Sequence, residues 1–208
     1  MEKDKEIVQY DRMRDELRTG DIVLFSGTGL ISMGIQFASR SPWSHVGMVI
    51  KDEEWDMLLL WESTTLSKVK DVESRNQRQG VAIRPLSARI RDYPSGRVAF
   101  RRLLDVEMTS TIRQALIGLR KEIKGRDYEQ SKIELMKSAY DGIFGDNEED
   151  LSSIFCSELV AEALQRMGVL KEHDEQGGYP SNEYTPADFA KDNIMGHKNG
   201  AFSDLIYV

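Results

Sequence analysis

The segment HVGMVIKDEEWDMLLLWE, residues 45–62, decides the fold because it contains two apolar runs joined by a charged stretch. The runs extend from His45 to Ile50 and from Met57 to Trp61, and residues 51–56 separate them. Apolar runs of this length, bounded by polar turn residues, are typical of buried strands. A short polar link between two such runs indicates an antiparallel hairpin. We therefore expect a sheet built around this hairpin.

Outward from the hairpin, strands predominate in the first half of the chain and helices in the second. Further strands are predicted at residues 22–25, 81–85, 97–104 and 205–208. Apolar side chains at helical spacing predict helices at residues 7–17, 30–39, 112–123, 133–143 and 153–167, and a threonine before a proline predicts a short helix from Thr185. The pattern predicts one α+β domain over residues 1–208, with an N-terminal helix at 1–18, a strand-rich part at 19–104 and a helical part at 105–208.

The composition is typical of a globular protein in water. The 208 residues carry a formal net charge of −7, with 40% hydrophobic and 30% charged residues. This acidity and the dispersed Lys and Arg argue against a nucleic-acid surface, which needs clustered positive charge. The longest apolar stretches fall far short of the ~20 residues that span a bilayer, and the charged N-terminus lacks the apolar region of a secretory signal. We expect a cytosolic protein without a transmembrane segment.

Metal and disulfide chemistry have little support in the sequence. A single cysteine, Cys156, cannot form an internal disulfide. The one cysteine and three histidines offer no CxxC or HExxH spacing, so we expect no metal site and no cofactor. His173 and His197 lie in polar stretches, where solvated side chains are expected.

Cys156 is the residue on which the functional interpretation depends. If Ser153 caps the predicted helix, Cys156 occupies the first turn, where free N–H groups and the helix dipole favour negative charge. Such a position, together with a neighbouring imidazolium, lowers a thiol pKa from ~8.5 to between about 3.5 and 7.5. The Cys156 N–H is then also a candidate oxyanion donor. The alternative is that Cys156 is buried filler, because free cysteine is among the most buried residue types.

His45 and Glu62 are the candidate partners of this cysteine. In a register that joins Ile50 to Met57, His45 lies directly opposite Glu62, with Cβ atoms ~5 Å apart on one face. A two-residue slip leaves the pair diagonal on that face, whereas a one-residue slip separates it. Gly47 shares the face and indicates close approach by another element, for which the cysteine helix is a candidate. The alternatives are a polar edge histidine and a glycine that only bends the strand.

Four segments together resemble one known family. They are Asp21 to Leu24, Trp43 to Val49, Trp61 to Ser63 and Phe155 to Val160. They look like the circularly permuted, NlpC-type branch of the papain-like cysteine hydrolases, in which histidine precedes cysteine along the chain. The resemblance extends over residues 19–190 and implies a permuted papain-like α+β fold, with a small antiparallel sheet or half-barrel packed on helices.

The resemblance also implies a catalytic triad. Cys156 is the nucleophile, His45 is the base and then the acid, and Glu62 orients the imidazole. The substrate-binding or oxyanion candidates beside this triad are Tyr128, Trp43 and Ser157.

The predicted function is a thiol-dependent hydrolase that cleaves a peptide, isopeptide or acyl-amino-acid amide bond through a thioester on Cys156. One alternative is a lipid or thioester acyltransferase, or an esterase, with the same triad. The other is a non-catalytic binding domain on the same scaffold. The expected substrate is a small peptide or an acyl-amide or lipid-like molecule, and the sequence does not fix the oligomeric state.

Overall fold

The computed structural model describes residues 10–27, 40–64, 67–93, 97–124 and 148–208. The helices predicted at residues 30–39 and 133–143 lie outside the described residues. At the N-terminus, residues 10–13 are helical and a 3-10 turn, η1 (Arg14–Glu16), follows, which confirms the described part of the predicted N-terminal helix.

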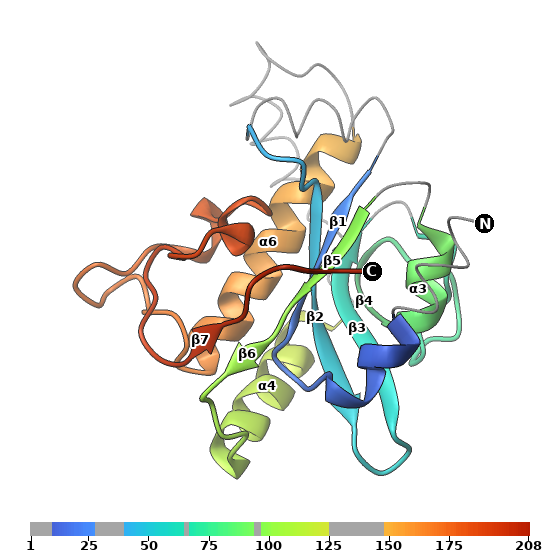
Figure 1. The fold of residues 1–208 in the computed structure, drawn as a ribbon, viewed down its shortest axis with the longest axis horizontal. Helices are drawn as coiled ribbons and strands as arrows, with labels where there is room; N and C mark the ends of the chain where they lie inside the picture. The colour runs from blue at the N-terminus through green and yellow to red at the C-terminus, as the bar shows by residue number, and fades with distance from the viewer. Residues whose placement is uncertain (1–9, 28–39, 65–66, 94–96, 125–147) are drawn as a thin grey trace.

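A six-stranded antiparallel sheet forms the centre of the molecule, in the order β4-β3-β2-β1-β5-β8 (Figure 1). Its strands are β1 (Ile22–Ser26), β2 (His45–Asp52), β3 (Met57–Thr64), β4 (Gly80–Pro85), β5 (Arg97–Arg101) and β8 (Ile206–Tyr207). The predicted strand at 97–104 continues after a break as β6 (Leu103–Leu104), which pairs with β7 (Ala201–Phe202) in a second, two-stranded sheet. The predicted strands are therefore present, and the α+β class is confirmed.

Helices lie on both sides of the sheet (Figure 1). The long α6 (Glu148–Arg166) and α4 (Ser110–Ile123) lie on one side, and the short α3 (Leu86–Asp92) lies on the other. Helix α3 was not predicted from the sequence, because seven residues are too few to show a helical period. No helix among the described residues is long and apolar enough to cross a membrane.

Two helical boundaries differ from the prediction. Helix α6 begins at Glu148, several residues before the predicted cap at Ser153, and it ends just before Gly168, which has the positive φ of 72° expected of a helix stop. The helix predicted from Thr185 is a single 3-10 turn, η3 (Asp188–Ala190), in which the Asp188 carboxylate accepts from the Thr185 backbone and hydroxyl. Another such turn, η2 (Ser181–Glu183), precedes it.

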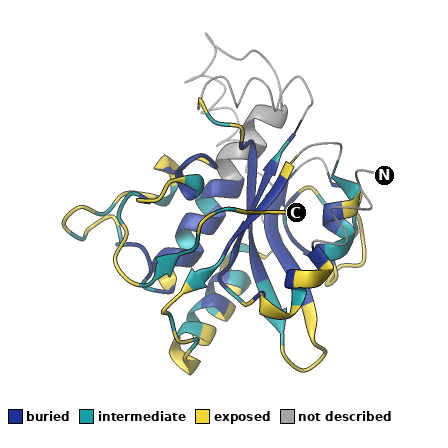
Figure 2. Ribbon diagram, viewed as in Figure 1, coloured by how far each residue is buried: buried dark blue, intermediate teal, exposed yellow. Residues whose placement is uncertain are grey.

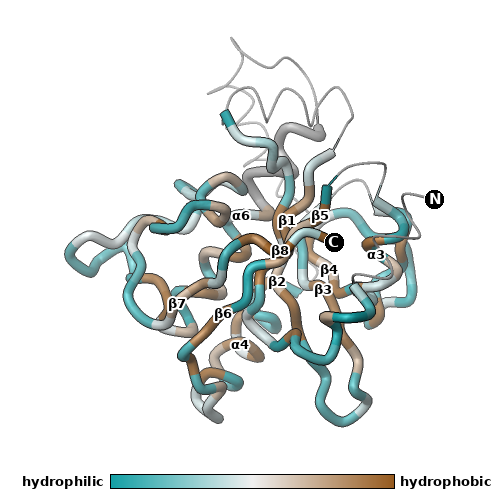
Figure 3. Tube along the Cα trace, viewed as in Figure 1, coloured by the Kyte–Doolittle hydropathy of each residue, from teal (hydrophilic) through white to brown (hydrophobic). Residues whose placement is uncertain are grey.

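Both faces of the sheet are buried, as Figure 2 shows by the dark strands between α6 and α3. Val46 and Met48 of β2 belong to a hydrophobic cluster on the α6 side, whereas Val49 and Leu60 belong to a second cluster on the α3 side. Side chains of a strand point alternately to the two faces, so a strand covered on both faces has no polar alternation. This explains why the central strands are continuous apolar runs, visible as brown segments in Figure 3.

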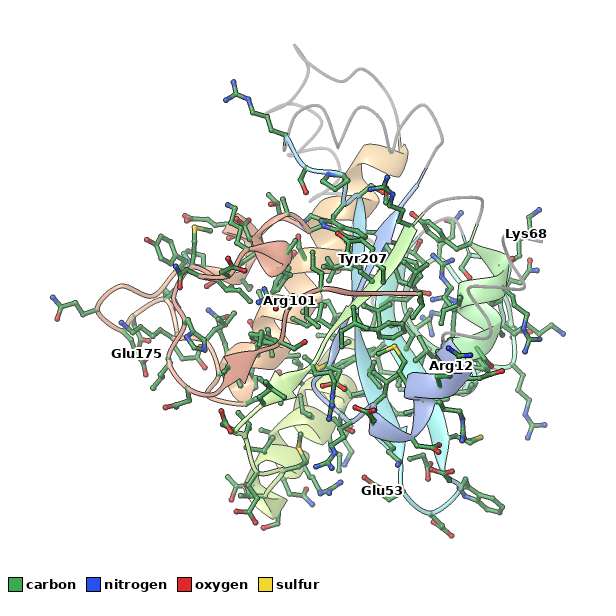
Figure 4. The ribbon with its side chains drawn as sticks, in the orientation of Figure 1. Arg12, Glu53, Lys68, Arg101, Glu175 and Tyr207 are labelled. Atoms are coloured by element: carbon green, nitrogen blue, oxygen red, sulfur yellow. The ribbon has the colours of Figure 1, made fainter. Side chains whose placement is uncertain are left out.

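The C-terminal segment is held to the sheet by the buried Arg101 of β5, labelled beside it in Figure 4. Its guanidinium donates to the backbone oxygens of Ser203 at 2.8 Å, Phe189 at 3.1 Å and Lys191 at 2.5 Å. One guanidinium carries several donors in a fixed geometry, so a single side chain fixes two loops. The chain end is thereby placed where β8 can pair with β5.

The β2–β3 hairpin has a register two residues away from the predicted one. Ile50 lies opposite Leu59, not opposite Met57, and Asp52 is the residue opposite Met57. The Asp52 carboxylate accepts from two backbone N–H groups of the turn, each at 3.1 Å, so the strands continue pairing up to a four-residue loop. His45 and Glu62 are therefore diagonal neighbours on one face, the arrangement expected of a two-residue slip.

Gly47 allows this hairpin to close. A Cβ at this position would lie 2.8 Å from Leu60 Cδ1 and 3.2 Å from the Trp61 carbonyl oxygen. The element that approaches Gly47 is therefore β3, and the suggestion that the cysteine helix approaches it was wrong.

Replacing Gly47 with alanine is expected to lower the free energy of unfolding by about 1–3 kcal/mol, as for other overpacked cores. Urea denaturation followed by circular dichroism measures this change. The control is Gly118→Ala on α4, where a Cβ meets nothing within 4 Å. This variant should gain about 0.5–1 kcal/mol from helix propensity. A Gly47→Ala protein as stable as the wild type would show that β3 does not constrain this position.

Candidate functional site

The candidate site is built around the Glu62 carboxylate, which is fully buried on β3. Its Oε2 lies 2.6 Å from Nε2 of His45, the first residue of β2. The diagonal arrangement on neighbouring strands brings the two side chains together on one face. The structure thus joins two of the predicted site residues, although through a different register.

Two arginines hold the other oxygen of this carboxylate. Arg84 on β4 donates from Nη1 to Glu62 Oε1 at 3.2 Å, and Arg89 on α3 donates from Nε at 2.8 Å. The Arg89 guanidinium also lies over the rings of Phe25 and Tyr93, at 5.2 and 5.0 Å from their centroids. Phe25 in turn lies 5.6 Å from the His45 ring, between centroids. One buried, closely packed cluster therefore contains the polar groups of Glu62, His45, Arg84 and Arg89.

The charges in this cluster fix the protonation of both predicted partners. Burial opposes ionisation of Glu62, but Arg89, His45 and Arg84 together lower its pKa to about 2. Burial lowers the pKa of His45, against the opposing influence of Glu62. At neutral pH the site therefore contains an ionised carboxylate and a neutral imidazole. Because a carboxylate only accepts hydrogen bonds, the imidazole proton is on Nε2 and the lone pair is on Nδ1.

Cys156 lies within α6, not in its first turn, and is fully buried. Burial raises the pKa of its thiol to about 12; the Glu62 carboxylate acts in the same direction, and the Val46 and Ser157 backbone amides act against it. The expectation of a thiolate stabilised by a helix N-terminus was wrong, because the helix begins earlier and the sulfur is enclosed. The resting cysteine is a protonated thiol.

The thiol and the imidazole lie near the same end of β2, on opposite faces of the sheet. The His45 ring lies against Phe25 on the α3 side, whereas Cys156 belongs to the cluster on the α6 side. A hydrogen bond from the Val46 backbone amide to the sulfur places the thiol beside the peptide that follows His45. In the described part of the chain, the last pair of β2 and β3 at this end is Met48 opposite Trp61. His45, the first residue of β2, lies beyond that pair.

The remaining predicted site residues have different surroundings. Trp43 is buried in the cluster that contains Cys156, and its ring lies 6.0 Å from that of Tyr207, between centroids. The buried Ser157 hydroxyl donates to the Tyr184 carbonyl at 2.5 Å. Tyr128 lies outside the described residues. The structure thus places Trp43 in the same hydrophobic cluster as Cys156 and gives the Ser157 hydroxyl a backbone partner.

Sequence reasoning missed Arg84, Arg89 and Tyr93. Arg84 interrupts the apolar run of β4, and a charged residue inside a buried strand is a signal that a partner exists elsewhere. Arg89 and Tyr93 gave no such signal, since α3 itself was not predicted. Burial raises the pKa of Tyr93, whereas a hydrogen bond with Ser44 and the charge of Arg89 lower it.

No group of three or more His, Cys, Asp and Glu side chains suited to a metal ion occurs within the described ranges. The clustered titratable side chains are instead paired with arginine. The cluster around Glu62 therefore offers an ionised carboxylate, an imidazole and two guanidinium groups.

Comparison with known proteins does not support the family suggested by the sequence. No family model matches the chain, and no curated protein matches it. Among solved structures, it is similar to the metalloprotein YiiX from Escherichia coli O157:H7, described as DUF1105. That similarity has 20% identity and a TM-score of 0.48, over 92% of this chain and 96% of the other. The assignment to the permuted papain-like family is therefore corrected: no family model supports it, and the matched structure is not described by that name.

The low pKa of Glu62 predicts a specific acid sensitivity. A carboxyl group whose pKa falls from 4.5 to about 2 on folding stabilises the protein above pH 4.5, and this contribution is lost as the pH falls toward 2. The shift corresponds to roughly 3 kcal/mol. The difference in unfolding free energy between wild type and Glu62→Gln should therefore be of this order at pH 6 and should shrink toward pH 2.

Urea denaturation at several pH values tests this, with the exposed Glu54→Gln as the control that should show no such trend. Wild type and variant are compared at each pH because Asp21 also makes the stability of the protein depend on pH. Burial raises the pKa of Asp21 to about 6. Asp21 contributes in the opposite sense, since its stabilisation is lost as the pH rises through that value. A difference for Glu62→Gln that stayed constant with pH would contradict an ionised Glu62.

The enclosed thiol predicts slow alkylation. With a pKa of about 12, Cys156 is almost entirely protonated at pH 7.5, and its sulfur is covered. Iodoacetamide should therefore modify the native protein at least ~100-fold more slowly than the urea-unfolded chain. Mass spectrometry gives both rates without ambiguity, because the chain has one cysteine. Equal rates in the two states would contradict the enclosed position.

Proposed function

We propose that this protein is a thiol-dependent hydrolase that cleaves an amide bond through a thioester on Cys156. The observation that carries the proposal is the 2.6 Å contact between His45 Nε2 and an ionised Glu62. This contact fixes the tautomer and leaves Nδ1 as a base. Nδ1 is the ring nitrogen next to the residue's own backbone, and the Cys156 sulfur accepts from the next amide, that of Val46.

In the proposed reaction, His45 Nδ1 takes the thiol proton as the sulfur attacks the acyl carbon of the substrate. A C–S bond forms, and the carbonyl oxygen carries the negative charge of the tetrahedral intermediate. The C–N bond then breaks, and the leaving amine takes the proton from Nδ1. Water attacks the resulting thioester with the same imidazole as base, which releases the acid and restores the thiol.

Glu62 supports this cycle by stabilising the imidazolium that forms at each step. Arg84 and Arg89 keep Glu62 ionised and fixed in position. Because the resting thiol is protonated, the base is needed at the moment of attack. This requirement distinguishes the proposed reaction from one that starts with a preformed thiolate.

Trapping the acyl-enzyme tests the proposal directly. The protein is incubated with panels of acyl amides and activated acyl esters, and intact mass spectrometry detects the added acyl group. We expect an adduct that hydroxylamine removes, and we expect none in Cys156→Ala. An adduct that persists in Cys156→Ala would contradict a thioester on this residue.

The role of the imidazole is tested by kinetics on any substrate found in this way. His45→Ala should lower kcat/KM by about 10²- to 10⁴-fold, the usual contribution of general acid–base catalysis. The matched control is His173→Ala, since His173 is exposed and should not affect turnover. An unchanged rate in folded His45→Ala would remove His45 from the mechanism.

A non-catalytic binding domain is the second candidate, and the observation that favours it is the complete burial of Cys156. It predicts no adduct with any acyl reagent and no change in ligand binding on Cys156→Ala. An acyltransferase with the same residues would instead form the adduct and pass the acyl group to an added amine or alcohol.

A further inference from the structure

A cleft of about 160 Å³ lies between α4 and the end of β2 where the hairpin turns. Its apolar lining includes Ile50, Trp61, Ile83 and Leu116. Its volume is comparable to the ~150 Å³ engineered cavity that accepts benzene. The cleft is therefore large enough for one ring or a short branched chain.

The polar lining of this cleft is cationic, in a chain of net charge −7. Lys51, Arg113 and Arg120 contribute to it, and no acidic residue lines the cleft among the described residues. Lys51 pairs with Asp56 at 3.4 Å and Arg120 pairs with Glu73 at 2.6 Å. Arg113 forms no ion pair or side-chain hydrogen bond with the part of the chain that the structure describes. Among the described residues that line the cleft, Arg113 is therefore the cation without an ionic partner.

We infer that this cleft binds a small amphipathic carboxylate, with its apolar body against Trp61 and Leu116 and its carboxylate toward Arg113. Apolar walls with a few convergent polar groups are the usual composition of a small-molecule site. A carboxylate matches the guanidinium in charge and in the geometry of its two oxygens. The ligand class thus follows from the lining.

The cleft is separate from the candidate catalytic site. His45 is the first residue of β2, and Lys51 is close to its last. Trp61 and Ile83 of the cleft are next in sequence to Glu62 and Arg84 of the site. Successive side chains of a strand point to opposite faces, so the cleft lies on the α6 side of the sheet, whereas Glu62 and Arg84 lie on the α3 side. The inference therefore does not depend on the proposed hydrolase activity.

The test uses 3-phenylpropanoate as probe and 3-phenylpropanamide as its neutral counterpart. Two-dimensional NMR on the full chain gives the affinity and the location of binding, from shifts of the Trp61 indole N–H and the Ile50 amide. We expect millimolar binding of the carboxylate, weaker binding of the amide, and loss of the preference at high salt.

Arg113→Gln should weaken carboxylate binding by about two- to fivefold, the range for an exposed ion pair, and leave amide binding unchanged. The matched control is Lys121→Gln, which removes the same charge from an exposed position of α4 outside the cleft and should keep the preference. The inference would be overturned by equal affinity for acid and amide. It would also be overturned by shifts away from the cleft, by no binding at millimolar concentration, or by equal effects of the two substitutions.

Discussion

The buried charge of Glu62 is the constraint on which the site depends. An ionised carboxylate removed from water is costly unless charged or hydrogen-bonded partners surround it. Here the partners come from three different elements, with His45 on β2, Arg84 on β4 and Arg89 on α3. Strand pairing, the position of α3 and the protonation of the imidazole are therefore linked through one side chain.

The sequence pattern predicted both an oriented imidazole and an ionised thiol, and the structure contains only the first. The imidazole is held in one tautomer by a carboxylate, which suits it to act as a base. The thiol, in contrast, is enclosed by α6 and the sheet, and its pKa is raised to about 12. In the proposed reaction, the thiol therefore loses its proton to the imidazole during the chemical step and not before it.

The sheet has different surroundings at its two ends. At one end, strand pairing between β2 and β3 stops and buried polar side chains gather around Glu62. At the other, α4 and the hairpin border an apolar cleft with a cationic lining. The apolar core between these ends is continuous, because both faces of the central strands are covered.

The sequence by itself determined the strands, the α+β class and the shared face of His45 and Glu62, because apolar runs and alternation are local properties. It did not determine the register, since the Asp52 carboxylate closes a shorter turn than the charged stretch suggested. It also did not determine the state of Cys156, which depends on where α6 begins and on what covers the sulfur. Arg84 and Arg89 could be assigned to Glu62 only from the tertiary structure, because 22 and 27 residues of chain separate them from it and only folding brings their charges together.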